Sequence, residues 1–418
     1  MNVWIFQTGE PLHIDGNHVR GMRAMNLADS LLSNGHSVTI WTSSFIHYEK
    51  KHRSKSFKKI SVGKNLKICL VPSLGYEKHI GFGRLLDHFQ LAYNLRKQLK
   101  KEKVVPDVAF IGYPPIEFAY IASAWLKQKG VPFMLDAKDQ WPHIFLDPVP
   151  KTLRPLARIM FAPYFYLGQM AMRNASSFCS MTQSFLNWME EFSGRHLSDK
   201  DCVIPLSPLA DSISLEDRSV AKKWWAECGV TQSEKKRFFF VGSFSRAFDF
   251  APIVAAAKIA DKIGLGWQFV LCGDGDQAVN VHEMFKQSPN VVLPGWVDRS
   301  KVVVLAEMST LGLAPYQNNS NFSNNIPNKI IDYLSLGTPI VTPLSGEVSK
   351  LISEANVGGI YKANDGKALF DVLSFVSSDE EELTVKRNNA LKLYKFHFAG
   401  AKVYSRLVKK LLELGKGS

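Results

Sequence analysis

The stretch IPNKIIDYLSLGTPIVTP, residues 326–343, decides the fold. Pro327 suits the first turn of a helix, and Asn324 or Asn325 is placed to cap it. Gly337 stops the helix, and the apolar run after it indicates a buried strand. A short helix that passes through a glycine into an apolar strand is typical of folds in which helices and parallel strands alternate.

The polar side of this predicted helix carries residues suited to a nucleotide. Asn328 and Asp332 are four residues apart and share one face, with Lys329 alongside. The N-terminus of a helix presents free N–H groups and a partial positive charge to a phosphate. Asp332, further along the same helix, is placed to accept both hydroxyls of a ribose. The alternative is an ordinary amphipathic helix whose polar face is solvated.

The same alternation of short apolar runs and helical periodicity extends outward along both halves of the chain. The expected strands are Val3–Phe6, Ser37–Trp41, Leu66–Val71, Asp107–Ile111, Pro132–Leu135 and Ser177–Met181, then Arg237–Val241, Gln268–Cys272, Asn290–Leu293, Ser309–Leu313 and Pro339–Val341. We therefore predict an α/β protein of two Rossmann-like domains that face each other across a cleft. Ligands are expected at the carboxyl ends of the strands.

A proline-containing stretch, residues 204–208, separates the two series of strands. A length of 418 residues favours two domains. Residues 1–207 are the predicted N-terminal domain, 208–385 the C-terminal domain, and 386–418 a set of helices that return toward the N-terminal domain. A hinge is expected near residue 205.

The composition is that of an ordinary globular protein, with 46% hydrophobic and 21% charged residues. The first residues, MNVWIFQTGEP, lack the features of a secretory signal. The five cysteines are scattered, which fits neither a disulfide framework nor a zinc site. We expect reduced thiols in a cytoplasmic protein. The turn Gln7–Glu10 does not match the glycine-rich fingerprint of dinucleotide-binding domains, so no such cofactor is expected.

The formal net charge of +13 is concentrated in residues 51–100, where twelve lysines and arginines accompany only Glu77 and Asp87. Such a block favours an anionic partner, namely an acidic lipid surface or a phosphorylated substrate, and the alternative is a solvated basic loop. No motif for nucleic-acid binding is present, so nucleic acid is disfavoured. The apolar segment Leu153–Met172 is either an element lying in a bilayer surface or a helix buried against the first sheet.

Four stretches of the second half occur in the order and spacing of a known enzyme family. They are FFFVGSF (238–244), FVLCGDGD (269–276), NVVLPGWVDR (290–299) and LAPYQ…PNKIIDYLSLGTPIV (313–341). The chain resembles the retaining nucleotide-sugar glycosyltransferases of the GT-B type, and more narrowly glycosyltransferase family 4. The likeness is strong over about residues 236–360 and weaker over residues 16–44 and 135–142. The PNK form is similar to the bacterial subgroup that builds surface polysaccharides.

The resemblance implies roles for residues at the ends of two strands. Gly242 and Ser243 would approach the diphosphate of the donor through their backbone, and Arg246 would bind the same phosphates. Trp296 and Val297 would flank the base. The alternatives are a surface arginine at position 246 and a core tryptophan at position 296.

The remaining donor residues lie in the stretch quoted first. By resemblance, Asp332 would hold the ribose, Lys329 would reach a phosphate, and Asn328 belongs to the same set. The family usually has a glutamate eight residues before the ribose-binding acid, and this chain has Asn324 there. Asparagine bonds a sugar hydroxyl without carrying a charge, so the donor sugar stays open.

No metal is expected at the donor site. Residues 274–276 imitate the Asp-x-Asp metal motif of another transferase fold, but they occupy the position of a metal-free turn in the family that this chain resembles.

In the first half, Asp136 and Asp139 follow the expected strand Pro132–Leu135, where a cleft residue belongs. A carboxylate near the anomeric carbon orients an acceptor hydroxyl or stabilises oxocarbenium charge, so both are candidate catalytic residues. Which of Asp136, Asp139 and His143 is closest to the reaction centre stays open. The alternative for either aspartate is a helix cap or a salt bridge.

A second set of candidates comes from the first loop and helix. Gly16, Arg20 and Arg23 are candidates for binding the acceptor. Arg20 and Arg23 would share one helical face and meet an acceptor phosphate. Ordinary surface charge is the alternative for the two arginines.

The sequence therefore predicts a retaining, metal-independent glycosyltransferase with no cofactor. The donor is a nucleotide diphosphate sugar, with UDP favoured over GDP, and the acceptor is a lipid-linked saccharide of bacterial surface polysaccharide synthesis. The expected location is the cytoplasm, with peripheral contact to the anionic inner face of the cell membrane. The alternatives are a sugar-nucleotide epimerase and an inactive nucleotide-sugar-binding scaffold in a membrane assembly complex.

Overall fold

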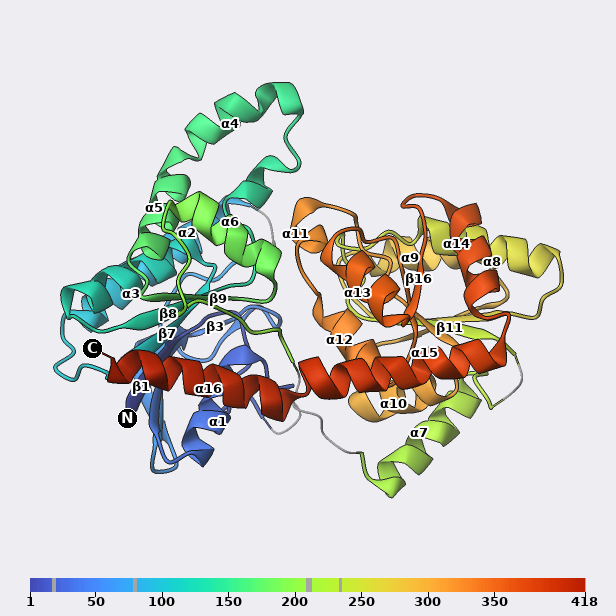
Figure 1. Ribbon diagram of the computed structural model, residues 1–418, viewed down its shortest axis with the longest axis horizontal. Coiled ribbons are helices and arrows are strands. Elements are labelled where there is room, and N and C mark those ends of the chain that lie inside the picture. Colours follow the sequence, from blue (N-terminus) through green and yellow to red (C-terminus); the bar gives the residue numbers. More distant parts are fainter. Residues whose placement is uncertain (17–19, 78–80, 208–212, 233–234, 418) are drawn as a thin grey trace. The chain divides into compact units, whose positions relative to one another are not determined.

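The computed structural model describes residues 1–16, 20–77, 81–207, 213–232 and 235–417. The chain divides into two compact units, the first made of Met1–Leu209 with Gly400–Ser418 and the second of Ala210–Ala399 (Figure 1). Residues 386–399, which we grouped with the C-terminal helices, thus belong to the second unit. The predicted boundary at residue 208 lies outside the described residues.

The first unit is built on an eight-stranded sheet of order β10-β9-β8-β7-β1-β2-β6-β5, parallel except for β5. Its strands are β1 (Asn2–Phe6), β2 (Ser37–Ser43), β5 (Lys58–Val62), β6 (Leu66–Val71), β7 (Val108–Tyr113), β8 (Phe133–Ala137), β9 (Ser177–Ser180) and β10 (Cys202–Val203). A separate hairpin joins β3 (Phe45–Ile46) and β4 (Lys51–His52). All six strands predicted for this half are present.

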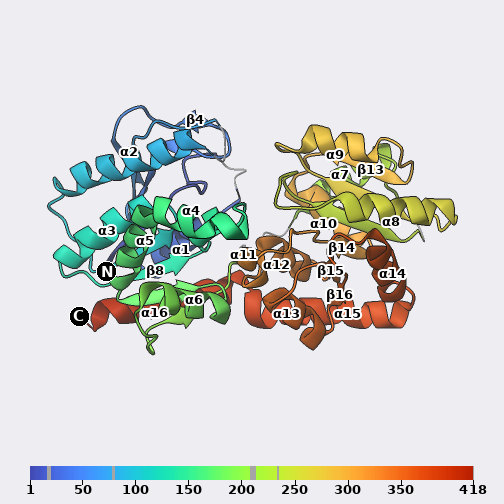
Figure 2. The same cartoon turned by 90° about the horizontal axis from the view of Figure 1, so that it is seen from above.

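Two layers of helices cover this sheet. The helical elements are α1 (Arg23–Ser33), α2 (Phe82–Leu99), α3 (Ile116–Gln128), η1 (His143–Leu146), η2 (Lys151–Leu153), α4 (Arg154–Met160), α5 (Ala162–Arg173), α6 (Gln183–Ser193) and α16 (Gly400–Lys416). Helices α1 and α16 pack together on one face, and α2, α3, α5 and α6 lie on the other (Figures 1 and 2).

Strand β1 shows why both faces are covered. Trp4 and Phe6 pack into the core beneath α2, α3 and α5, whereas Val3 and Ile5 pack into the core beneath α1 and α16. Successive side chains of a strand point to opposite faces, so an uninterrupted apolar strand requires cover on both sides. The fold class predicted from such runs is confirmed.

The edge strand β5 was not predicted. It lies in the basic block, and its exposed Lys58 and Lys59 hid the strand from a search for apolar runs. Lysines at a sheet edge discourage pairing with another chain, which is how an exposed edge is protected.

The second unit carries a six-stranded parallel sheet of order β13-β12-β11-β14-β15-β16. Its strands are β11 (Arg237–Val241), β12 (Gln268–Cys272), β13 (Val291–Gly295), β14 (Leu311–Leu313), β15 (Ile340–Thr342) and β16 (Gly358–Ile360). Its helical elements are α7 (Leu215–Glu227), α8 (Ala251–Lys262), α9 (Ala278–Phe285), α10 (Arg299–Glu307), α11 (Ser320–Ser323), α12 (Asn328–Ser335), α13 (Glu347–Ala355), α14 (Gly366–Val376), α15 (Glu380–Leu393) and η3 (Tyr394–Phe398).

Strand β11 again serves two cores. Phe238 and Phe240 pack beneath α8 and α14, and Phe239 meets the ring of Tyr333 on α12 at 5.1 Å between centroids. The contact of Tyr333 with Phe239 therefore holds helix α12 against the centre of the sheet.

None of the helices in the described ranges combines the length and hydrophobicity needed to span a bilayer.

Candidate active site

The second unit has one position where connections leave neighbouring strands in opposite directions. Within the sheet, β12 is the neighbour of β11 toward one edge and β14 is its neighbour toward the other edge. The chain leads from β11 to β12 and later returns to β14, so β11 and β14 flank the switch point. Ligands of open α/β sheets bind at such points, beyond the carboxyl ends of the strands. Gly242, Ser243 and Arg246 follow β11, and α12 with Asn328, Lys329 and Asp332 follows β14.

The two loops at this switch point are joined by backbone hydrogen bonds. The N–H of Asp249 donates to the carbonyl of Pro315 at 2.7 Å, and that of Gln317 to Ala247 at 2.8 Å. Gly242 and Gly273 approach so closely that a Cβ on Gly273 would lie 2.0 Å from the carbonyl oxygen of Gly242. Glycine is therefore required where the β11 and β12 loops meet.

Lys329 is placed differently from a solvent-facing lysine. Its side chain is 7% exposed, and its Nζ donates to the carbonyl of Val241. The same ammonium lies 4.0 Å from the ring centroid of Phe240 and 5.1 Å from that of Phe248. Such contacts stabilise a buried cation. Lys329 thus fixes α12 to the end of β11, and a Cβ on Gly242 would lie 2.4 Å from its Nζ.

Helix α12 begins at Asn328 after Pro327, and no side chain caps it. The predicted caps are wrong, because Asn324 ends helix α11 and Asn325 Oδ1 accepts from the N–H of Ile326 at 2.7 Å. The predicted stop is confirmed, since Gly337 has a φ of +63° just beyond the helix.

The outer face of α12 agrees with the sequence pattern. Asn328 and Asp332 are both partly exposed. Asp332 also acts on a buried phenol, because burial first and the negative charge of Asp332 second raise the pKa of Tyr316. Arg246 is exposed on its loop.

After β13, Trp296 is 73% exposed and Val297 is 6% exposed. Trp296 is therefore not a core residue, and its indole is accessible to a ligand. Among the residues described, no three His, Cys, Asp or Glu side chains are arranged to hold a metal ion. Asp274 Oδ1 accepts from the N–H of Gly275 at 2.7 Å.

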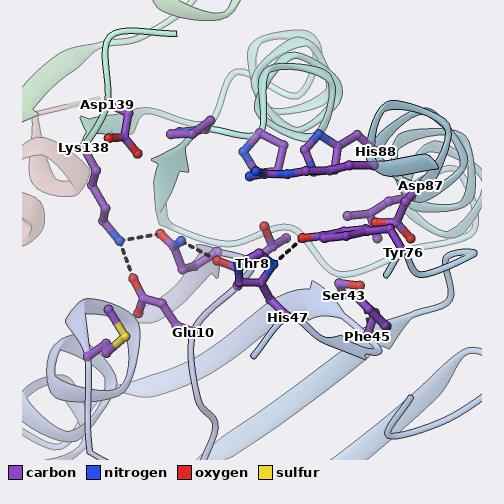
Figure 3. A pocket seen from close by; sticks show the side chains of 17 residues that line it. Thr8, Glu10, Ser43, Phe45, His47, Tyr76, Asp87, His88, Lys138 and Asp139 are labelled. Carbon is purple, nitrogen blue, oxygen red and sulfur yellow. Dashed lines mark hydrogen bonds and ion pairs between the residues drawn. The ribbon is translucent and has the colours of Figure 1, made fainter. Parts of the chain in front are cut away.

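The first unit has a corresponding switch point between β1 and β7, and a cavity of about 230 Å³ lies there. We call it the β1/β7 pocket. It is lined by Gln7, Thr8, Gly9, Glu10, Met22, Ser43, Phe45, His47, Tyr76, Arg84, Asp87, His88, Leu91, Pro114, Pro115, Lys138 and Asp139. Most of these follow β1, β2, β7 and β8 or belong to α2 (Figure 3).

Two groups of polar side chains face each other across this pocket (Figure 3). At one end, Lys138 Nζ pairs with Glu10 and donates to Gln7 Oε1 at 3.0 Å, with Asp139 beside it. Glu10 Oε2 also accepts from the N–H of Ala24 at 2.8 Å, so this carboxylate stabilises the start of α1.

At the other end, His47 hydrogen-bonds to the hydroxyl of Tyr76. Arg84 lies 5.7 Å from the ring centroid of Tyr76 and 5.1 Å from that of Trp141. Burial, together with the charge of Arg84, lowers the pKa of His88 to about 3, so His88 is neutral at pH 7. The pocket therefore combines carboxylates, two basic groups and aromatic rings, which suits a polar ligand with hydroxyls or phosphate.

Of the candidate catalytic pair, only Asp139 lines this pocket. Asp136 is fully buried, and Arg23 Nη2 lies 2.6 Å from its Oδ1 while Arg23 Nε lies 3.1 Å from its Oδ2. Strand β8 extends through Ala137, so Asp136 lies within it and points to the face covered by α1. The interpretation of Asp136 as catalytic and of Arg23 as acceptor-binding is corrected: they form a structural ion pair.

The other predicted acceptor residues lie apart from the pocket lining. Gly16 and Arg20 are exposed, and Gly16 has a φ of +107°. Helix α1 starts at Arg23, so Arg20 precedes the helix and the two arginines do not share a helical face. His143 is half-buried among aromatic rings, and burial first and Arg158 second lower its pKa to about 4.

The sequence interpretation missed most of the pocket. Glu10 stands in the turn after β1, and Lys138 stands between the two aspartates that we selected. Their position after strands was a usable signal. His47, Tyr76 and Arg84 come from a hairpin, a loop and a helix that no motif connects.

Comparisons with known proteins agree with this geometry. Residues 235–379 match the family model described as "Glycosyl transferases group 1". No curated protein matches the chain in sequence.

Solved structures extend the likeness to the whole chain. Sucrose-phosphate synthase from Thermosynechococcus elongatus is similar over 100% of both chains, with a TM-score of 0.75 and 13% identity. Anabaena HepE in complex with UDP-glucose is similar over 99% of this chain and 100% of its own, with a TM-score of 0.65 and 14% identity. WaaG, a glycosyltransferase involved in lipopolysaccharide biosynthesis, is similar over 98% of this chain and 99% of its own, with a TM-score of 0.65 and 12% identity.

At such identities the likeness concerns the fold. The chain has the GT-B fold of two Rossmann-like units, and residues 235–379 of its second unit match the model of the glycosyltransferase group 1 family.

Proposed function

We propose that this protein is a retaining glycosyltransferase that moves a sugar from a nucleotide diphosphate sugar to a saccharide acceptor. The observation that carries the proposal is the switch point between β11 and β14, where Gly242, Ser243 and the start of α12 lie within the segment that matches the family model. Backbone N–H groups and a helix N-terminus favour a diphosphate there.

The donor roles follow from this placement. Gly242, Ser243 and Arg246 bind the diphosphate, and Asp332 accepts hydrogen bonds from the ribose. Exposed Trp296, with Val297 beside it, meets the base. UDP is favoured over GDP, and the solved structure of HepE with UDP-glucose supports that choice.

The same groups provide the chemistry at the leaving diphosphate. Positive charge from Arg246 and the N–H dipoles of α12 stabilise the developing charge, which is the role that a metal ion has in other transferases. Asn324 and Asn328 remain candidates for contacts to the donor sugar, and Lys329 positions α12 by its bond to β11.

The β1/β7 pocket is the proposed acceptor site. Asp139, partly exposed in the pocket wall, is the proposed catalytic carboxylate that orients the acceptor hydroxyl or stabilises oxocarbenium charge. We propose a lipid-linked saccharide of bacterial surface polysaccharide synthesis as the acceptor, used at the cytoplasmic face of an anionic membrane.

The test is a thermal-shift series with UDP, GDP, ADP and UDP-sugars, with EDTA throughout. A ligand at about 100 times its Kd stabilises the folded state by roughly 2.7 kcal/mol, which such an assay detects. We expect a shift with UDP that Asp332→Ala abolishes and that the control Asp371→Ala retains, since Asp371 is an exposed acid on α14. No shift with any nucleotide would overturn the donor site.

A further inference from the structure

Exposed apolar side chains are concentrated on two neighbouring parts of the first unit. In the part of the chain that the structure describes, 25 large hydrophobic residues are exposed, and nine of them lie within residues 82–93 and 153–166. These two segments are a small share of the described residues, so the concentration is not random scatter. The nine are Phe82, Leu86, Phe89 and Tyr93 of α2, together with Leu153, Leu156, Ile159, Met160 and Tyr166. We call this set the apolar face.

On α2 these residues form one stripe. Their spacings of four, three and four residues place them on a single side of the helix. The α2 residues that line the β1/β7 pocket are Arg84, Asp87, His88 and Leu91, which at about 100° per residue lie on the opposite side. A single helix therefore separates the pocket from the apolar face.

Helices α4 and α5 continue the apolar face. The ring of Phe89 lies 6.0 Å from that of Tyr164 at the start of α5, so the stripe of α2 adjoins the α4–α5 segment. Ala157 is the one buried residue of α4, and Ile159 and Met160 are 73% and 67% exposed. Figure 1 shows α4 standing away from the sheet. The sequence left two alternatives for Leu153–Met172, a buried helix and an element lying in a bilayer surface. Helix α5 agrees with the first alternative, and helix α4 agrees with the second.

The charges around this face are mostly positive, although the exposed Asp147 lies within reach of Arg154. Apart from Arg84, which lines the pocket, helices α2, α4 and α5 with η2 carry the basic residues Arg96, Lys97, Lys151, Arg154, Arg158 and Arg173. Their only acidic residue is Asp87, which is 3% exposed and accepts from the N–H of Gly75 at 2.6 Å. Exposed apolar side chains among basic residues match an anionic bilayer surface.

We propose that the apolar face of α2 and α4 docks this protein on an anionic lipid bilayer. This inference rests on the proposed function, because it explains how a lipid-linked acceptor is used. The polar part of the acceptor enters the β1/β7 pocket while its lipid remains in the bilayer, and α2 forms the wall between them.

The charge pattern also distinguishes a bilayer from a second copy of the chain. A two-fold interface places the same patch against itself, so it would bring an excess of basic residues together.

The test is sedimentation of the full chain with vesicles, in the absence of donor and acceptor. We expect binding to vesicles of phosphatidylglycerol and much weaker binding to phosphatidylcholine. Ile159→Glu/Met160→Glu should reduce binding at least ten-fold. The matched control Leu215→Glu/Val279→Glu, at two exposed apolar residues of the second unit, should bind as the wild type does.

A second pair of variants tests the charge. Lys151→Gln/Arg158→Gln should weaken binding to phosphatidylglycerol by about five-fold per residue. Lys222→Gln/Lys223→Gln, on exposed positions of α7, should leave it unchanged.

Three results would overturn the proposal. They are no binding to anionic vesicles, equal binding by the Ile159→Glu/Met160→Glu variant, and a dimer in sedimentation velocity that this variant converts to monomer. Titration of the same samples with UDP keeps the two proposals apart. Failure to bind vesicles with UDP binding intact refutes the docking surface alone, and loss of UDP binding refutes the proposed function.

Discussion

Replacing Asp136 by asparagine removes the only carboxylate that Arg23 contacts in the described structure, and we expect a large loss of stability. Asp136 is fully buried and the Arg23 side chain is 1% exposed. Burial acts to lower the pKa of Arg23, but the charge and hydrogen bonding of Asp136, together with smaller contributions from Cys179 and Tyr404, raise that pKa by more, so the guanidinium stays charged.

The magnitude follows from the contacts that remain. Arg23 also donates to the carbonyls of Pro205 at 2.8 Å and Ile204 at 3.0 Å, which satisfy hydrogen bonds without neutralising the charge. Breaking a buried ion pair from one side costs about 3–5 kcal/mol. For a unit of this size that corresponds to a fall in Tm of roughly 6–20 °C.

The assay is thermal unfolding followed by circular dichroism, combined with sugar transfer measured below the transition. Asp139→Asn is the matched control, and we expect it to lose transfer with a change of less than about 1 kcal/mol in stability. The double variant Arg23→Met/Asp136→Leu should recover most of the lost stability, because apolar pairs replace buried ion pairs well. An Asp136→Asn variant that melts like the wild type and yet transfers no sugar would refute the structural role and restore Asp136 as catalytic.

Three further outcomes are expected. Gly273→Ala should weaken UDP binding by about ten-fold or more, because the added Cβ meets a backbone carbonyl at 2.0 Å, and titration calorimetry measures this. Tyr333→Phe should cost about 1–3 kcal/mol in urea unfolding, because its hydroxyl accepts from the N–H of Val241 at 3.3 Å and donates to the carbonyl of Leu313 at 3.1 Å; an unchanged midpoint would contradict that tie. Burial raises the pKa of Glu117 to about 7. The folded state therefore holds a proton that the unfolded chain releases near its ordinary pKa of 4.5, and stability falls as pH rises from about 4.5 to 7, by on the order of 3 kcal/mol. Glu117→Gln should remove this pH dependence, and a wild-type slope in the variant would show that another group is responsible.

The sequence predicted the sheets well because their strands are buried on both faces. In runs such as FFFV before Gly242, successive side chains pack into the cores on the two faces of the sheet, so every position of the strand is apolar. The edge strand β5 was not predicted because it contains exposed lysines, which protect the edge of the sheet, and a search for apolar runs excludes such a segment.

The candidate site was predicted in part for a related reason. Gly242 directly follows strand β11, and Asn328 and Asp332 lie on helix α12. Their positions therefore follow from the local sequence pattern that predicts this strand and this helix. The prediction for Asp136 failed because β8 ends two residues later than expected, so Asp136 lies within the strand and its side chain points to the face covered by α1. His47, Tyr76 and Arg84 meet only through tertiary packing, which neither periodicity nor motif spacing encodes.

Lys329 shows what the pattern omits. The family resemblance suggested contact with a phosphate, yet three aromatic rings and the carbonyl of Val241 surround its ammonium group. A helical wheel places the Cβ of a lysine, whereas its long side chain follows the packing.

The central claim is sugar transfer from a nucleotide diphosphate sugar, and the most direct measurement is release of UDP from UDP-sugars by the purified protein. We expect UDP release that requires Asp332 and Asp139, increases when a saccharide acceptor is added, and persists in EDTA. Tight UDP binding with no release from any UDP-sugar, with or without acceptor, would contradict the account and favour a nucleotide-sugar-binding scaffold.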